Sequence, residues 1–336
     1  MTSKFIEFSI KGKTGIINLN RPKALNALDF DMACLFLETL LKWKQSPKIE
    51  RVLLLGEGKA LCAGGDVKSL YLSSGKNNLK KVFFQKEYSL NHNINEFNKD
   101  YLSIWDGIVM GGGVGLSIYG NYRLASEKAK FAMPETAIGF FPDVGGSFFL
   151  SRLPRGIGLY LGLTGKICNA RDIMDLGFAT HYSPSELIDS IKNRYIEDGE
   201  INTSNYYPEM SSEITENQNF IEDIFQGNIE NIMNNLKITK NEFGKTIYSH
   251  LLTRCPMSLA VTVKLLNTSK TKTLKESLDL EYKIGQHMVY RNDFNNGVDS
   301  VLVSKNNNPL WYPSSIYDIN YSELDKMFST DIQDYE

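Results

Sequence analysis

A short apolar run, a glycine-rich turn and a helical pattern recur along the first half of the chain, and this repeat is the strongest constraint on the fold. Residues 52–55 are continuously apolar, as expected for a strand covered on both faces. Ile104 and Trp105 lead into a second glycine-rich turn, with a helix predicted over 112–119. Strands are also predicted at 122–125 and 130–133. Repeated units of this kind up to about residue 180 indicate an α/β fold.

The flanking segments complete the predicted organisation. The alternation of Ile6, Phe8 and Ile10 before a turn at 11–14 predicts a β-hairpin. A helix is predicted from Asp29 to residue 46, and 71–100 are predicted as an exposed polar helix and loop. Helical patterns dominate the end of the chain, and Leu278, Tyr282 and Met288 are predicted to share one helix face. We expect two regions, an α/β core at 1–205 and a helical part at 206–336.

Composition excludes several classes of protein. With 42% hydrophobic and 23% charged residues, the 336-residue chain resembles ordinary globular proteins. A net charge of -2 gives no prior for nucleic acid as a partner. No apolar run approaches the roughly 18 residues of a membrane span, so no membrane partner is expected. The four cysteines and four histidines form no disulfide or zinc pattern, so we expect reduced thiols in a soluble intracellular protein.

Two glycine turns are candidates for binding a ligand through the backbone. One is Ala63-Gly64-Gly65 after an apolar strand, and the other contains Gly112 at the predicted start of a helix. Small residues let a backbone N–H approach a ligand, and a helix start adds unpaired N–H groups. Two such donors on one carbonyl oxygen would form an oxyanion hole. Taken singly, each turn is equally typical of close packing, and neither matches a nucleotide-binding loop.

Two carboxylates follow in apolar surroundings. Glu135 comes after a predicted strand and Pro134, and Asp143 stands between Pro142 and Val144. Carboxylates in such places tend to keep or share protons, which suits acid–base or nucleophilic chemistry. The alternative is that Glu135 caps a helix and Asp143 starts a turn, and spacing alone leaves both interpretations open.

Together these motifs resemble the crotonase (enoyl-CoA hydratase/isomerase) superfamily, and within it the 3-hydroxyisobutyryl-CoA hydrolase family. The resemblance rests on N-R-P-x-A-L-N-A-L at 20–28, C-A-G-G-D at 62–66, G-G-G at 111–113 and P-E at 134–135 with P-x-x-G-G at 142–146. Later motifs, including Glu281-Tyr282, extend it over most of the chain. The resemblance implies a spiral of ββα units with a helical C-terminal region that covers an acyl-CoA site.

The resemblance also implies roles for individual residues. Gly65 and Gly112 would donate the oxyanion N–H groups, with Glu135 as the catalytic glutamate and Asp143 as a second acidic residue. Further matches are the segment that lines the CoA path, Lys23, Ala24 and Leu25, and Ala63 beside the oxyanion turn. Gly115 stands where hydratases carry a second glutamate, so water addition across a double bond is not expected.

The expected activity is hydrolysis of 3-hydroxyisobutyryl-CoA, or a similar small 3-hydroxyacyl-CoA, in valine catabolism. Glu135 would attack the thioester to give an anhydride or would activate water, and the sequence leaves both routes open. No metal or redox cofactor is expected, since CoA is part of the substrate.

Enoyl-CoA hydratase or isomerase activity and a non-catalytic acyl-CoA or RNA-binding role are the alternative functions. The resemblance suggests the mitochondrial matrix, although the N-terminus has no presequence pattern, so a cytoplasmic location stays open, as does a homo-oligomer. Three lysines, Lys76, Lys80 and Lys81, are candidates for contact with the CoA phosphates.

Overall fold

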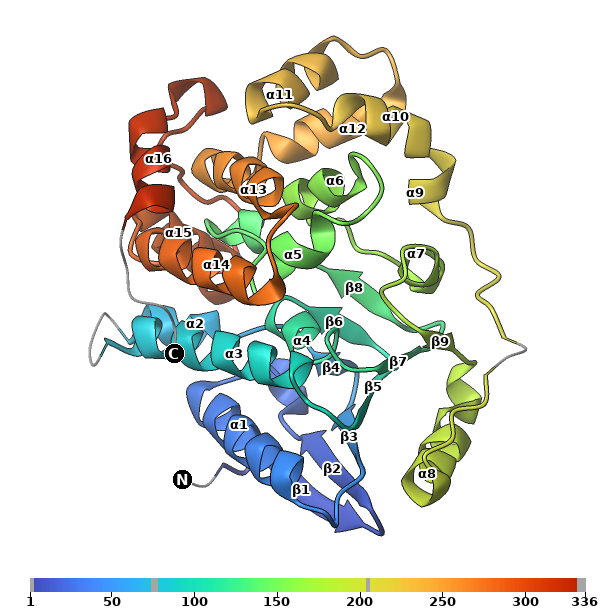
Figure 1. Cartoon of the computed structure of the whole chain (residues 1–336). Helices are drawn as coiled ribbons and strands as arrows, with labels where there is room; N and C mark the ends of the chain where they lie inside the picture. The colour runs from blue at the N-terminus through green and yellow to red at the C-terminus, as the bar shows by residue number, and fades with distance from the viewer. Residues whose placement is uncertain (1–2, 74–77, 204–205, 331–336) are drawn as a thin grey trace. The chain divides into compact units, whose positions relative to one another are not determined.

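The computed structural model describes residues 3–73, 78–203 and 206–330 (Figure 1). The chain forms two compact units, each assembled from three stretches. The first unit comprises Met1–Asp66, Ser89–Ala132 and Ile167–Glu213, and the second comprises Val67–Tyr88, Met133–Lys166 and Ile214–Glu336. The predicted regions at 1–205 and 206–336 follow chain order instead, and that division stays a prediction. Within the described residues, no helix combines the length and apolar character needed to cross a membrane.

The first unit contains two sheets, and from β3 onward the chain alternates between them (Figure 1). The larger sheet has the order β1 (Ile6–Lys11), β2 (Thr14–Leu19), β3 (Arg51–Gly56), β5 (Asp100–Trp105), β7 (Tyr122–Ala125) and β9 (His181–Tyr182). The smaller has β4 (Ala60–Cys62), β6 (Ile108–Met110) and β8 (Lys130–Ala132). Apart from the β1–β2 hairpin, neighbouring strands are parallel. From β3 to β8, each successive pair of strands adds one strand to each sheet, which confirms the expected spiral α/β architecture.

Apolar side chains from distant elements fill the core of the first unit. Ile16, Leu53 and Leu102 of the larger sheet pack with Tyr195 of α8 (Ile188–Asp198). The helix α1 (Phe30–Gln45) begins where predicted, because the Asp29 side chain accepts a hydrogen bond from the Met32 amide at 2.8 Å.

Two predicted segments differ from the structure. The helix expected over 112–119 is only α4 (Gly112–Gly115), since glycine is a poor helix former and the chain continues as turns. The segment expected to be exposed, 71–100, contains the end of α2 (Val67–Leu72) and the whole of α3 (Leu79–Asn95), whose residues up to Tyr88 belong to the second unit. Phe84 and Tyr88 of α3 are buried in the second unit. Their i, i+4 spacing forms an apolar stripe that the surrounding lysines and asparagines obscure.

The second unit is mainly helical (Figure 1). Its principal helices are α5 (Gly146–Leu150), α6 (Ile157–Thr164), α10 (Gln218–Ile224), α11 (Ile229–Ile238), α12 (Glu242–Leu251), α13 (Pro256–Ser269), α14 (Leu274–Met288), α15 (Asn292–Val298) and α16 (Tyr321–Ser329). A capping box of Thr273 and Glu276 starts α14, whose Leu278, Tyr282 and Met288 are all buried. The predicted shared face of these three residues is confirmed.

Candidate active site

The turn after β4 contains a backbone amide, that of Gly65, with no hydrogen-bond acceptor among the residues that the structure describes. Leu28 donates its N–H to the Gly64 carbonyl at 2.9 Å, and Asp66 donates to the Leu28 carbonyl at 2.8 Å. In this parallel bridge the intervening residue, Gly65, directs its own N–H away from Leu28. The Gly65 amide donates no hydrogen bond within the part of the chain that the structure describes. It is therefore available to a ligand.

The start of α4 supplies a second such amide in the same unit. Gly112 is the first residue of α4, where an N–H has no acceptor within its own helix, and it donates none elsewhere in the described residues. A Cβ built on Gly64 would lie 3.8 Å from the Gly112 nitrogen, so the two turns are adjacent. A Cβ built on Gly113 would lie 2.1 Å from the Cys62 carbonyl oxygen. Only glycine lets α4 pack this closely against the end of β4.

The segment at 20–28, which begins with the N-R-P motif, stabilises the glycine turn after β4. Asn26, at φ 57°, donates from its side chain to the carbonyls of Glu57 and Ala60. Arg21 forms an ion pair with Asp66 at 2.8 Å. The Ala63 amide donates to the Leu25 carbonyl at 3.0 Å, so the structure brings these two predicted residues together.

The remaining predicted residues of the first unit are also placed. Lys23 and Ala24 form a short 3₁₀ turn, in which the Lys23 side chain is exposed. Gly115 is buried as the last residue of α4 and has no side chain to offer.

In the second unit, Glu135 opens a short 3₁₀ turn directly after Pro134. Its side chain is buried, and its Oε2 atom has no hydrogen-bond partner among the described residues. Burial and the nearby Asp143 raise the pKa of Glu135 well above its ordinary value of 4.5. A buried carboxylate oxygen without a partner is costly, and such groups are typical of sites that bind or transform a ligand.

Asp143 lies in the same unit and accepts a hydrogen bond from the Tyr88 hydroxyl at 2.8 Å. Burial raises the pKa of Asp143 to about 7, against the opposing effect of the Tyr88 hydrogen bond. A carboxyl group of this pKa can both accept and donate a proton near neutral pH.

Two further buried carboxylates belong with Glu135 and Asp143, and neither was predicted as a site residue from the sequence. Glu87 of α3 is 2% exposed, and burial together with the charge of Asp143 raises its pKa. Glu281 of α14 is fully buried and accepts hydrogen bonds from Gly145 and Ser147. Its pKa is raised by burial to about 8. The available signal was an acidic residue within an apolar helical stripe, as at Glu281 between Leu278 and Tyr282.

These four side chains form what we call the carboxylate cluster: Glu87, Glu135, Asp143 and Glu281. Mutual repulsion in a buried setting prevents all four from ionising together, so protons are shared among them near neutral pH. Such a cluster can supply both a base or nucleophile and a proton donor. No three of the described His, Cys, Asp and Glu side chains are grouped so as to hold a metal ion.

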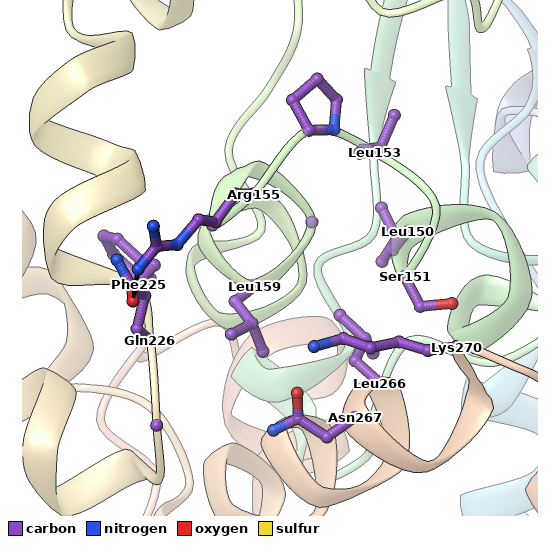
Figure 2. Close-up of a pocket in the computed structure, with 14 residues that line it drawn as sticks. Leu150, Ser151, Leu153, Arg155, Leu159, Phe225, Gln226, Leu266, Asn267 and Lys270 are labelled. Carbon is purple, nitrogen blue, oxygen red and sulfur yellow. Dashed lines mark hydrogen bonds between the residues drawn. The ribbon is translucent and has the colours of Figure 1, made fainter.

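A surface cavity of about 320 Å³ lies elsewhere in the second unit (Figure 2). Its walls come from the end of α5, the start of α6, Phe225–Gly227 and the end of α13. In Figure 2 the Arg155 side chain extends toward Gln226, and Lys270 extends toward Leu159. No member of the carboxylate cluster lines this cavity, so it is not the candidate active site.

The three lysines predicted as candidates for contact with the CoA phosphates differ in what the structure shows for them. Lys80 is buried in the second unit and donates to the Val289 carbonyl at 2.9 Å and to the Asn295 side chain at 3.1 Å. It therefore ties α3 to the helices of that unit, and its prediction as a phosphate contact is wrong. Lys81 is exposed, and Lys76 lies outside the described residues.

The chain is similar to known proteins over nearly its whole length. A family model described as enoyl-CoA hydratase/isomerase matches residues 14–328. The mitochondrial 3-hydroxyisobutyryl-CoA hydrolase of Xenopus laevis is 39% identical over 95% of this chain and 87% of its own length. The corresponding hydrolase of Homo sapiens is 37% identical over the same shares.

Solved structures match as well. A carnitinyl-CoA dehydratase from Mycobacterium thermoresistibile is 32% identical, with a TM-score of 0.93 over 99% of both chains. An enoyl-CoA hydratase from Rhodobacter sphaeroides 2.4.1 is 29% identical, with a TM-score of 0.92 over 97% of both chains. The proteins similar to this chain thus include some named as hydrolases and others named as a dehydratase or a hydratase.

Proposed function

The chain belongs to the 3-hydroxyisobutyryl-CoA hydrolase family of the enoyl-CoA hydratase/isomerase superfamily, and we propose from this that it hydrolyses 3-hydroxyisobutyryl-CoA to the free acid and CoA. The observation that carries the proposed chemistry is Glu135, a buried carboxylate with an unpartnered oxygen beside Asp143. A thioester hydrolase of this kind needs such a nucleophile or base together with a proton donor.

In the proposed reaction, the amides of Gly65 and Gly112 polarise the thioester carbonyl. Each donor of an oxyanion hole contributes about 10²–10³ in rate. The proposal requires these amides and Glu135 to act on one thioester.

Glu135 then attacks the carbonyl carbon or activates water for the attack. In the anhydride route the carbon–sulfur bond breaks as Glu135 displaces the CoA thiolate, and water then adds its hydroxyl to the Glu135 carboxyl carbon, which releases the acid with an oxygen from Glu135. In the direct route the water hydroxyl joins the acyl carbon as the carbon–sulfur bond breaks. In both routes the thiolate of CoA takes up a proton. Asp143 either supplies that proton or binds the 3-hydroxyl group, and its pKa of about 7 is compatible with both roles.

Replacement of Glu135 tests the assignment. We expect Glu135→Gln to lower kcat for 3-hydroxyisobutyryl-CoA by at least about 10³, because the amide can neither attack nor accept a proton. The measurement is thiol release by the purified variant. The control is the same change at the exposed Glu186, which we expect to retain full activity. Wild-type rates from Glu135→Gln would refute the role of Glu135.

Single-turnover hydrolysis in ¹⁸O-labelled water distinguishes the two routes. Label in the Glu135 carboxyl group is expected for the anhydride, and label confined to the product acid is expected for direct attack by water. The same preparation, followed at the enone absorbance of crotonyl-CoA, tests the hydratase alternative. Gly115 offers no second carboxylate at the hydratase position, so we expect negligible hydration.

The remaining parts of the proposal concern the surroundings of the reaction. Lys23, Ala24, Leu25 and Ala63 border the CoA path, where the exposed Lys23 faces the phosphates. The chemistry uses no metal or redox cofactor, so activity should survive EDTA. The relatives' names place them in mitochondria, and we propose the same compartment here, tested by imaging the tagged chain. Sedimentation of the purified protein tests whether it is a homo-oligomer.

A further inference from the structure

Glu281 stands out among the buried side chains that the proposed reaction does not use. It lies on the apolar face of α14 and uses both carboxylate oxygens. Oε2 accepts from the Gly145 amide at 2.7 Å, and Oε1 accepts from Ser147, from its amide at 2.9 Å and its hydroxyl at 2.6 Å. Burying a carboxylate is strongly unfavourable unless such donors surround it. The cluster of donors therefore explains how this position tolerates an acid.

The donors belong to a turn whose backbone needs external support. Val144 and Gly145 are consecutive residues with positive φ, 51° and 81°. For a β-branched residue such as Val144 this conformation is unfavourable and persists only when its surroundings enforce it. The Gly146 amide closes the turn onto the Asp143 carbonyl at 2.7 Å. The hydrogen bond from the Gly145 amide to Glu281 holds this turn one residue after Val144.

Asp143 is the residue that this turn presents. Its carboxyl group accepts from the Tyr88 hydroxyl on one side, and its own backbone forms the first corner of the strained turn. If the turn relaxed, the carboxyl group would move, and a displacement of about 1 Å can cost about 10² in rate. We propose that Glu281 is a positioning residue, which holds the 143–147 turn so that Asp143 meets the substrate in the reactive orientation. This inference rests on the proposed hydrolase function.

Glu281 also acts on the cluster through its charge. The titratable groups that share its surroundings are Glu87, Tyr88, Glu135 and Asp143. Burial is the first cause of the raised pKa of Glu135, and the charged form of Glu281 adds the last contribution. Because the pKa of Glu281 is itself raised by burial to about 8, this contribution acts only as the pH approaches and exceeds that value.

The test is Glu281→Gln. The variant keeps the size of the side chain but has only one acceptor oxygen, so one of the two amides, of Gly145 or Ser147, loses its partner. We expect kcat for 3-hydroxyisobutyryl-CoA to fall about 10–100-fold per folded molecule, with KM changed less.

Two companion variants separate positioning from general destabilisation. Ser147→Ala removes one donor and leaves the Glu281 carboxyl group in place, so we expect a smaller loss of kcat. Glu276→Gln makes the same chemical change on the exposed capping box of the same helix. It should leave kcat unchanged even if α14 loses stability.

A folded Glu281→Gln enzyme with wild-type kcat would overturn the inference, as would a loss that merely follows the folded fraction. A measurement made without substrate tests this inference independently of the proposed function. In ¹³C NMR spectra, Glu281→Gln should alter the Asp143 carboxyl signal and its titration, whereas Glu276→Gln should not. If wild-type protein hydrolyses no acyl-CoA, the proposed function fails, while the NMR comparison still decides whether Glu281 holds Asp143.

Discussion

At the scale of single residues, the protonation of Asp143 depends on two opposing influences. Burial raises its pKa to about 7, while the Tyr88 hydroxyl stabilises the charged form by donating at 2.8 Å. The hydroxyl therefore keeps this carboxyl group titrating near neutral pH rather than above it. Local sequence gives no hint of this, because the two residues are 55 positions apart.

Tyr88→Phe removes only that hydroxyl, so we expect the pKa of Asp143 to rise above about 7. The measurement is a ¹³C NMR titration of the Asp143 carboxyl group. Tyr101→Phe is the control, because it deletes a buried tyrosine hydroxyl in the first unit, bonded to the Leu116 carbonyl. An Asp143 pKa that stays the same or falls in Tyr88→Phe would contradict the expectation.

At the scale of elements, α4 is a helix of four residues, and its glycines have distinct tasks. Gly112 presents an amide that has no acceptor within the described part of the chain, whereas Gly113 allows contact with the backbone of β4. The closest atoms to a Cβ on Gly113 are the Cys62 carbonyl oxygen at 2.1 Å and carbon at 2.7 Å. Backbone atoms within a sheet cannot move aside as a side chain can.

We expect Gly113→Ala to destabilise the protein by about 3 kcal/mol, the upper end for overpacking, and to disturb the two oxyanion amides. Urea unfolding and thiol release measure the two effects. Gly162→Ala in α6 is the control, since its Cβ would meet only side-chain atoms, the nearest at 3.3 Å. Equal effects from the two substitutions would argue against the backbone contact as the cause.

At the scale of the whole molecule, the near-neutral net charge of -2 leaves pH dependence to individual buried groups. Asp143 and Glu281 titrate at about 7 and about 8 when folded, above their ordinary values of 3.8 and 4.5. At a pH between the ordinary pKa and the raised pKa of each group, the folded chain holds more protons than the unfolded chain. Their contribution to stability is therefore fully present below about pH 4 and declines as pH rises toward 8.

We expect the free energy of unfolding to decline less steeply in Glu281→Gln than in wild type between about pH 4.5 and 8. The difference in slope approaches about 1.4 kcal/mol per pH unit, the value for one proton. Urea unfolding across this range measures it, with Glu186→Gln as an exposed control that keeps the wild-type slope. Parallel curves for wild type and Glu281→Gln would contradict the raised pKa of Glu281.

The sequence by itself determined the α/β class, most strand positions, the glycine turns and the family, because apolar periodicity and turn residues act over a few neighbouring positions. It also identified Glu135 and Asp143 as the acids to consider. The tertiary structure decided that α3 is buried and that Glu87 and Glu281 join these acids. Glu281 reaches Gly145 across 136 residues, and burial and charge at that distance depend on how the chain folds.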